Sequence, residues 1–206
     1  MNVTELLRKT SLTRGSNPET GAMTPASLDD VLQTFRDYGH RLYGEEVTEL
    51  QHALQCAALA QAAGESSTVI VAALLHDFGH LCHALGEHIA DREVDARHEY
   101  IGYEKLKGLF TDEIVAACRL HVAAKRYLCW KEPEYLQGLT PASQKSLRIQ
   151  GGPMNQAEAE VFEREPHFAL ALRVRRYDDK GKVRGMTTPD LDSFLPLMQT
   201  LVRTDA

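Results

Sequence analysis

Apolar residues recur along most of the chain at steps of three and four, the spacing that gathers them on one face of an α-helix. The first such run follows Thr24-Pro25, a capping residue with a proline placed to suit the first helical turn. Its apolar positions are Leu28, Val31, Leu32, Phe35, Tyr38 and Leu42. Gly44 interrupts the pattern, and a second run covers about 46–63. The pattern predicts two helices, each with one buried face.

The most apolar stretch of the chain is 69–75, which has no polar face. A helix that is apolar all round belongs in the interior, so this stretch predicts the central helix of the fold. We expect it to run from Thr68 to about Ala84, with Ser66-Ser67 as its cap and with His76 and His80 on one face. A β-strand is the local alternative because Val and Ile open the stretch, but the following Ala and Leu residues favour a helix.

The rest of the chain also has helical patterns, separated by short polar loops. Helices are expected over roughly 95–110, 111–129, 143–149, 155–164, 166–177 and 188–203, with charged loops over 85–94 and 177–185. Residues 1–13 have an amphipathic pattern compatible with a short helix. No repeat or linker divides the chain, so we predict one all-α helical bundle over 24–206, preceded by an N-terminal arm over 1–23.

Composition narrows the class of protein. The 206 residues include 23 Lys and Arg against 29 Asp and Glu, a net charge of −6 that disfavours a nucleic-acid partner. The chain contains no run of about 18 apolar residues, as a membrane span would need, and its N-terminus lacks the apolar core of a signal peptide. Four cysteines without a CxxC pair indicate free thiols: Cys56, Cys82, Cys118 and Cys129. We therefore expect a cytoplasmic protein with neither a nucleic-acid nor a membrane partner.

Candidate chemistry centres on the histidines, of which there are nine. His76-Asp77 ends the most apolar stretch, where a carboxylate needs a partner or a metal to be buried. The string His76 to His80 resembles the H-E-x-x-H motif of zinc proteases. Asp reaches less far than Glu as a general base, however, and Gly79 disfavours a helix. A site rich in His and carboxylates and poor in Cys suits a harder metal such as iron.

Other candidate ligands lie in helix-like stretches: His52, His98, His121 and Asp178. Taken singly, each is more often a satisfied helical residue than a ligand. The same ordinary interpretation holds for His40, His83, His88 and His167. The order of the first set along the chain, and not any single residue in it, indicates a shared site.

That order, His52, His76-Asp77, His98, His121 and Asp178, resembles the HD-domain superfamily. Within it, the chain is similar to the PhnZ/TmpB-type mixed-valent diiron oxygenases, which cleave the C–P bond of organophosphonates and are related to myo-inositol oxygenase. The similar strings are LQHALQCA (50–57), AALLHDFGH (72–80), HVAAKRYL (121–128), SQKSL (143–147), QGGPM (150–154) and RRYDDKGK (175–182). The resemblance runs from about 40 to 195 and implies an HD-domain helical bundle.

The resemblance implies a pair of iron ions. One iron would be held by His52, His76 and Asp178, and the other by His98 and His121. Asp77 would bridge them. The pair would be mixed-valent Fe(II)/Fe(III), with O₂ as co-substrate.

It also implies a phosphonate site made by His80, Lys125, Ser143 and Arg175. Spacing agrees with this, because Lys125 lies one helical turn after His121 and Arg175 lies one turn before Asp178. Two cations near the metals suit a dianionic group.

Glu45 corresponds to a carboxylate that contacts the substrate ammonium and closes over the site. Three residues earlier, the enzymes that act on the primary amine have a Tyr that caps the second iron. This chain has Leu42 there and Tyr43 beside it. Either Tyr43 takes over the capping role or the role is missing. Alternatively, Tyr38 and Tyr43 form part of an aromatic cage for a quaternary ammonium.

The implied activity is O₂-dependent C–P cleavage of 1-hydroxy-2-(trimethylammonio)ethylphosphonate or 1-hydroxy-2-aminoethylphosphonate. The products would be phosphate and glycine betaine or glycine. A second hypothesis is an HD-type metal-dependent phosphohydrolase, since the same ligands can activate a water. A third is a helical binding domain without activity. The substrate amine, the oligomeric state and the role of 1–23 stay open.

Overall fold

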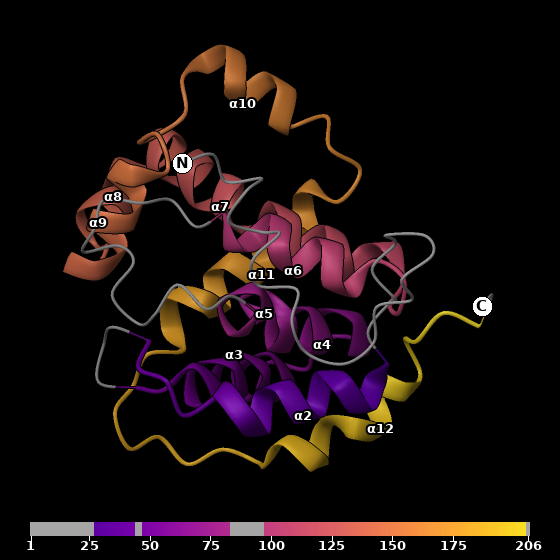
Figure 1. The fold of residues 1–206 in the computed structure, drawn as a ribbon. Helices are drawn as coiled ribbons and strands as arrows, with labels where there is room; N and C mark the ends of the chain where they lie inside the picture. Colours follow the sequence, from indigo (N-terminus) through magenta and orange to yellow (C-terminus); the bar gives the residue numbers. More distant parts are fainter. Residues whose placement is uncertain (1–26, 44–46, 83–96, 205–206) are drawn as a thin grey trace, which may run out of the picture.

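The computed structural model describes residues 27–43, 47–82 and 97–204, and over these ranges the chain is all-α (Figure 1). The first half contains α2 (Leu28–Tyr38), α3 (Glu49–Ala62), α4 (Ser67–Leu75), α5 (Phe78–Leu81), α6 (His98–Leu106) and α7 (Asp112–Lys131). The second half contains α8 (Pro133–Gln137), α9 (Pro141–Ile149), α10 (Gln156–Phe162), α11 (Phe168–Lys180), the 3₁₀ helix η2 (Leu191–Phe194) and α12 (Leu195–Gln199). The predicted fold class is confirmed. None of the helices in the described ranges is both long and apolar enough to cross a membrane.

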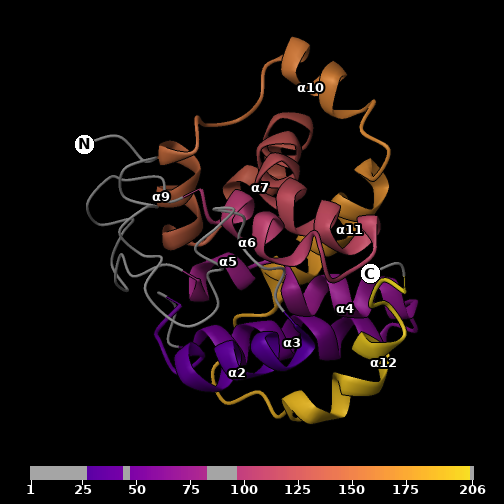
Figure 2. The same cartoon turned by 45° about the vertical axis from the view of Figure 1, so that its right-hand side comes forward.

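Helix α4 lies in the middle of the bundle in both views (Figures 1 and 2). Every residue from Val69 to Leu75 is buried, and α4 packs against α3, α7, α11 and α12. The expectation of a central, all-apolar helix is therefore confirmed, and Ser66 caps it by accepting a hydrogen bond from the amide of Val69.

The start of α2 differs from the prediction. Ser27 is its N-cap, and Ser27 and Asp30 form a capping box in which each side chain accepts a hydrogen bond from the other's amide. Thr24-Pro25 lies outside the described residues. The helix ends at Tyr38, so Leu42 is not on its apolar stripe; it is 51% exposed and pairs with Thr48 in an isolated β-bridge.

The expected single helix through His76 and His80 is also wrong. Helix α4 ends at Leu75, and a separate one-turn helix, α5, begins at Phe78. Asp77, at φ −100° and ψ 12°, departs from helical geometry. This break turns the Asp77 side chain away from the direction that a continuous helix would give it.

Three further differences lie in the second half of the chain. Helix α11 continues to Lys180, so Asp178 is helical and does not lie in the expected charged turn. Helix α8 was not predicted, because five residues are too few for a periodic pattern. The expected helix over 188–203 is split into η2 and α12, with Pro196 in the first turn of α12. The four cysteines are free, as expected.

We predict that Leu74→Ala lowers the free energy of unfolding by about 2–5 kcal/mol, because it leaves a cavity in the core. Leu74 is 1% exposed at the centre of the bundle. Urea denaturation followed by circular dichroism measures the change. Val161→Ala is the control, since Val161 is 65% exposed and its truncation leaves no cavity. A loss no larger than that of the control would contradict the central position of α4.

Candidate metal centre

Five helices bring six buried side chains to one place. His52 is on α3, His76 and Asp77 follow α4, His98 begins α6, His121 is on α7 and Asp178 is on α11. Each of these residues is at most 7% exposed. Side chains separated by as many as 126 positions therefore meet in the interior, where unpartnered imidazoles and carboxylates would be costly.

The six side chains form two groups that share Asp77. His52, His76, Asp77 and Asp178 make the first group, and Asp77, His98 and His121 make the second. Within each group the potential ligand atoms lie within 4.8 Å of one another.

The two oxygens of Asp77 face different groups. Its Oδ2 lies 3.5 Å from the Nε2 of His52 and 3.3 Å from that of His76. Its Oδ1 lies 3.3 Å from the Nε2 of His98 and 3.1 Å from that of His121. A carboxylate that presents one oxygen to each of two groups has the arrangement of a bridging ligand.

Backbone carbonyls orient three of the imidazoles. The Nδ1 atoms of His52, His76 and His121 lie 2.8, 2.8 and 2.7 Å from the carbonyl oxygens of Gly181, Ala73 and Cys118. A carbonyl only accepts hydrogen bonds, so each Nδ1 carries the hydrogen. In a neutral ring, the Nε2 lone pair then points into the centre, as in metal-bound histidines.

The inward nitrogens lie close to one another. Nε2 of His98 is 2.9 Å from that of His121, and Nε2 of His52 is 3.3 Å from that of His76. Two lone pairs at these distances repel unless a cation or a proton lies near both. Among the described residues, buried Asp77 Oδ1 and Asp178 Oδ1 have no hydrogen-bond partner. Imidazole nitrogens and orphaned carboxylate oxygens together fit a pair of metal ions.

Electrostatics keep the carboxylates charged. Burial raises the pKa of Asp77, but the charge of nearby His76, among other groups, outweighs it and holds that pKa well below its usual range. For Asp178, burial is likewise outweighed, by Arg175 and Lys182 among others. The centre therefore presents negative charge to a cation at neutral pH.

The two histidines at the middle of the centre respond differently. Burial lowers the pKa of His121 to about 4, so this ring is neutral and its Nε2 can donate a lone pair to a metal ion. For His76, burial is outweighed by Asp77 and Asp178, which raise its pKa to about 10. The carboxylates that attract a proton to His76 would attract a metal ion in its place.

Cationic side chains surround Asp178. Arg175 donates from Nη1 to Asp178 Oδ2 at 2.5 Å, and its Nη2 donates to Asp179. Lys182 Nζ lies 3.5 Å from Asp178 Oδ1 and donates to Ser143 Oγ at 3.1 Å. Lys125 is 4% exposed, and burial together with Arg175 lowers its pKa to about 7. This side of the centre therefore concentrates positive charge in an otherwise acidic protein.

The residues expected to bind the phosphonate lie on two sides. Lys125, Ser143 and Arg175 are on the side of Asp178, where Lys125 donates to Ser146 Oγ at 2.8 Å. His80 is on the other side, stacked on His98 with ring centroids 3.9 Å apart. Glu45 lies outside the described residues.

Tyr43, and not Leu42, reaches the centre. Its hydroxyl donates to Asp77 Oδ2 at 2.8 Å, and its ring stacks on His52 with centroids 3.9 Å apart. This Asp77 oxygen is the one that faces the first group. Tyr38 is 40% exposed with the Arg41 guanidinium over its ring. In the described residues, Tyr38 and Tyr43 therefore do not form an aromatic cage.

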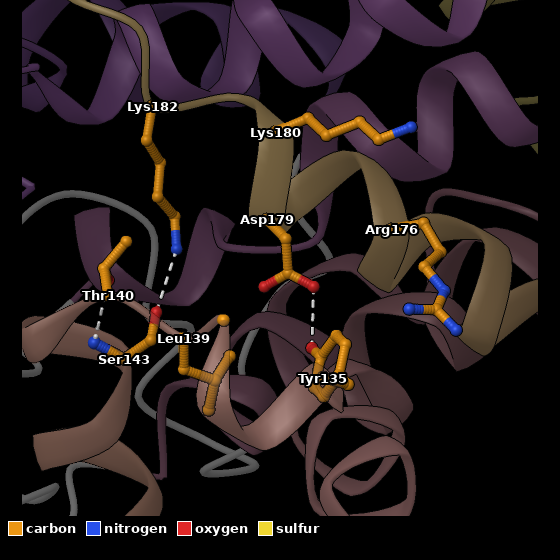
Figure 3. A pocket seen from close by; sticks show the side chains of 9 residues that line it. Tyr135, Leu139, Thr140, Ser143, Arg176, Asp179, Lys180 and Lys182 are labelled. Carbon is orange, nitrogen blue, oxygen red and sulfur yellow. Dashed lines mark hydrogen bonds between the residues drawn. The ribbon is translucent and has the colours of Figure 1, made fainter. Parts of the chain in front are cut away.

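Lys182 is a residue of the centre that the sequence analysis missed, because it lies in the charged loop expected over 177–185. Its side chain is 7% exposed and lies over the Tyr43 ring, with Nζ 5.5 Å from the centroid. The available signal was its position four residues after Asp178. Lys182 and Ser143 also line a pocket with Tyr135, Leu139 and Thr140 (Figure 3). In that view Lys182 extends to Ser143, whereas Lys180 is directed elsewhere.

Comparison with known proteins agrees with this geometry. The model of the HD domain matches residues 50–147. The chain is 43% identical to a [1-hydroxy-2-(trimethylamino)ethyl]phosphonate dioxygenase (glycine-betaine-forming) of Leisingera caerulea, covering 77% of this chain and 81% of that protein. It is 40% identical to a hydroxymethylphosphonate dioxygenase of Gimesia maris, covering 81% of this chain and 84% of that protein.

We predict that Asp77→Asn lowers the bound metal from two ions per chain to one or none, because an amide cannot bridge two cations. Plasma mass spectrometry of the purified protein, reconstituted with iron under anaerobic conditions, measures the content. Asp37→Asn makes the same chemical change at an exposed position and should keep the wild-type content. Two tightly bound ions in Asp77→Asn would exclude Asp77 as the bridge.

Proposed function

The chain belongs to the HD-domain family and, within it, to the group of the phosphonate dioxygenases, and on this basis we propose that it uses O₂ to cleave the C–P bond of a 1-hydroxyphosphonate. The observation that supports this most directly is Asp77, with one carboxylate oxygen facing each of two histidine groups. The overall reaction is R–CH(OH)–PO₃²⁻ + O₂ → R–COO⁻ + HPO₄²⁻ + H⁺. Carbon loses four electrons, which reduce O₂, and the C–P bond breaks.

The proposed cofactor is a mixed-valent Fe(II)/Fe(III) pair. His52, His76 and Asp178 would hold one iron, His98 and His121 the other, and Asp77 both. Imidazole and carboxylate ligands without thiolate are typical of non-haem iron. Cys56 Sγ lies 3.7 Å from His52 Nε2, but its thiol donates a hydrogen bond to the Tyr177 carbonyl oxygen, so the proposal leaves Cys56 out of the ligand set. When bound, the iron pair supplies the binding and reduction of O₂.

The cations on the Asp178 side provide the phosphonate site in this proposal. Ser143, Lys125 and Lys182 donate to the phosphonate oxygens, and His80 contacts the substrate from the side of His98. Arg175 adds positive charge and also orients Asp178, to which it donates directly. A dianion held by several buried cations is bound more strongly than at a solvated surface, because the local dielectric constant is lower.

Tyr43 has a positioning role in the proposal. Burial, with Asp178 and Asp77 adding to it, raises the pKa of Tyr43 well above its usual range, so its hydroxyl stays protonated. It can therefore donate to Asp77 Oδ2 throughout the physiological range and keep the bridging carboxylate in one orientation.

The substituent R distinguishes the two named relatives. His52 is stacked on Tyr43, Lys182 also lies over the Tyr43 ring, and Arg41 lies over Tyr38, so the proposal contains no aromatic cage. A cationic R would instead be matched by Glu45, the carboxylate expected to close over the site. The proposal therefore includes both the trimethylammonio and the primary amino substrate, with Glu45 as the cation partner.

We predict that phosphate release requires O₂. The iron-loaded enzyme should be incubated with hydroxymethylphosphonate, 1-hydroxy-2-aminoethylphosphonate and its trimethylammonio analogue, each in air and under anaerobic conditions. Phosphate and the carboxylate product should appear together, and only in air. Phosphate at the full rate without O₂, or hydrolysis of a phosphodiester with Mn²⁺ or Mg²⁺, would establish a phosphohydrolase instead.

Lys182→Met should raise KM for the preferred substrate roughly 10–100-fold, the loss expected for one hydrogen bond to a charged group. Lys107→Met is the matched control, since it makes the same chemical change at an exposed lysine that does not line the pocket. Steady-state kinetics at a fixed iron content separates this effect from metal loss. Equal KM values for the two variants would remove Lys182 from the phosphonate site.

A further inference from the structure

Helices α5 and α6 touch through their backbones at Gly79. A Cβ atom placed on Gly79 would lie 1.9 Å from the carbonyl oxygen of His98 and 2.8 Å from the amide nitrogen of Gly102. Gly79 does not have a positive φ, so its backbone conformation does not itself require glycine. The close approach of the two backbones is the reason why a larger residue does not fit.

This contact holds together the two segments that carry Asp77 and His98, which both belong to the second group. Gly79 follows Asp77 by two residues, and His98 is the first residue of α6. The 3.3 Å separation of Asp77 Oδ1 and His98 Nε2 therefore depends on how closely α5 approaches α6. The stacking of His80 on His98 depends on the same approach.

The first group has a corresponding contact at Gly181. A Cβ there would lie 2.4 Å from Cys56 Sγ, 3.2 Å from the Cys56 amide nitrogen and 3.3 Å from the His52 carbonyl oxygen. The Gly181 carbonyl oxygen is also the acceptor for His52 Nδ1. Gly181 lacks a positive φ as well. Its closeness to α3 thus sets the position of His52 relative to Asp178, three residues earlier on the chain.

We propose that Gly79 and Gly181 are positioning residues, each of which sets the metal occupancy of one group. Gly79 would control the group of Asp77, His98 and His121, and Gly181 the group of His52, His76 and Asp178. This inference rests on the two-metal centre of the proposed function. It adds that the two metal sites can be disabled separately by a single methyl group at a helix contact.

The atoms that an added Cβ would meet differ between Gly79 and Gly181. At Gly79 the obstacle is a backbone carbonyl, which no side-chain change can remove. At Gly181 the shortest contact is the Cys56 sulfur, which Cys56→Ala removes, leaving contacts of 3.2–3.3 Å that small shifts can accommodate. The Gly181 site therefore allows a rescue experiment, whereas the Gly79 site does not.

The experiment measures iron per chain after anaerobic reconstitution, together with the electron paramagnetic resonance signal of the coupled Fe(II)/Fe(III) pair after partial oxidation. Wild type should bind two irons and show the signal. Gly79→Ala and Gly181→Ala should each bind about one iron and lack the signal, because a coupled pair needs both sites. Circular dichroism confirms that each variant is folded.

Two controls test the steric explanation. Gly138→Ala should keep both irons, since a Cβ there would lie 3.5 Å or more from its nearest neighbours. Gly181→Ala combined with Cys56→Ala should regain the second iron and the signal, whereas Cys56→Ala alone should lose neither. Should Gly79→Ala fail to fold, the Gly181 rescue still tests the inference.

The outcomes separate this inference from the proposed function. Two irons and the coupled signal in folded Gly79→Ala or Gly181→Ala would overturn the inference and leave the proposed function intact. Loss of iron in Cys56→Ala alone would overturn the steric explanation by making Cys56 itself a ligand. A wild-type protein that binds fewer than two metals would overturn both.

Discussion

The organising constraint of this structure is the burial of one carboxylate among four imidazoles. Asp77 is 7% exposed, and its two oxygens face opposite histidine pairs. A carboxylate in this environment is stable only if positive charge lies close to both oxygens. The proposed pair of metal ions would meet that requirement, and the helices that carry the histidines are packed so that all four rings reach Asp77.

The fold meets this constraint by interrupting its own central helix. The apolar residues of α4 anchor the middle of the bundle, and the chain leaves helical geometry at Asp77, immediately after the last buried turn. The break lets His76 and Asp77 enter the same site, while α5 turns back against α6. Rigid packing on one side of the site and close backbone contacts on the other hold the candidate ligands in position.

The basic side chains around Asp178 are opposite in sign to the net charge of the protein. The protein has a net charge of −6, yet Lys125, Arg175 and Lys182 are buried together beside Asp178. Burial, with repulsion by Arg175 and Lys182 adding to it, lowers the pKa of Lys125 to about 7. An arriving dianion would relieve this repulsion, so an acidic protein can bind an anionic substrate through local rather than overall charge.

The sequence by itself determined the helical class, the central position of 69–75 and the order of the candidate ligands, because periodicity and motif spacing are local properties of the chain. Only the tertiary structure decided which oxygen of Asp77 faces which pair, that Tyr43 rather than Leu42 points inward, and that Lys182 belongs to the centre. The helix break at Asp77 and the extension of α11 to Lys180 were likewise invisible to local patterns. These features depend on contacts between helices distant in sequence, where a single turn of backbone changes which side chains meet.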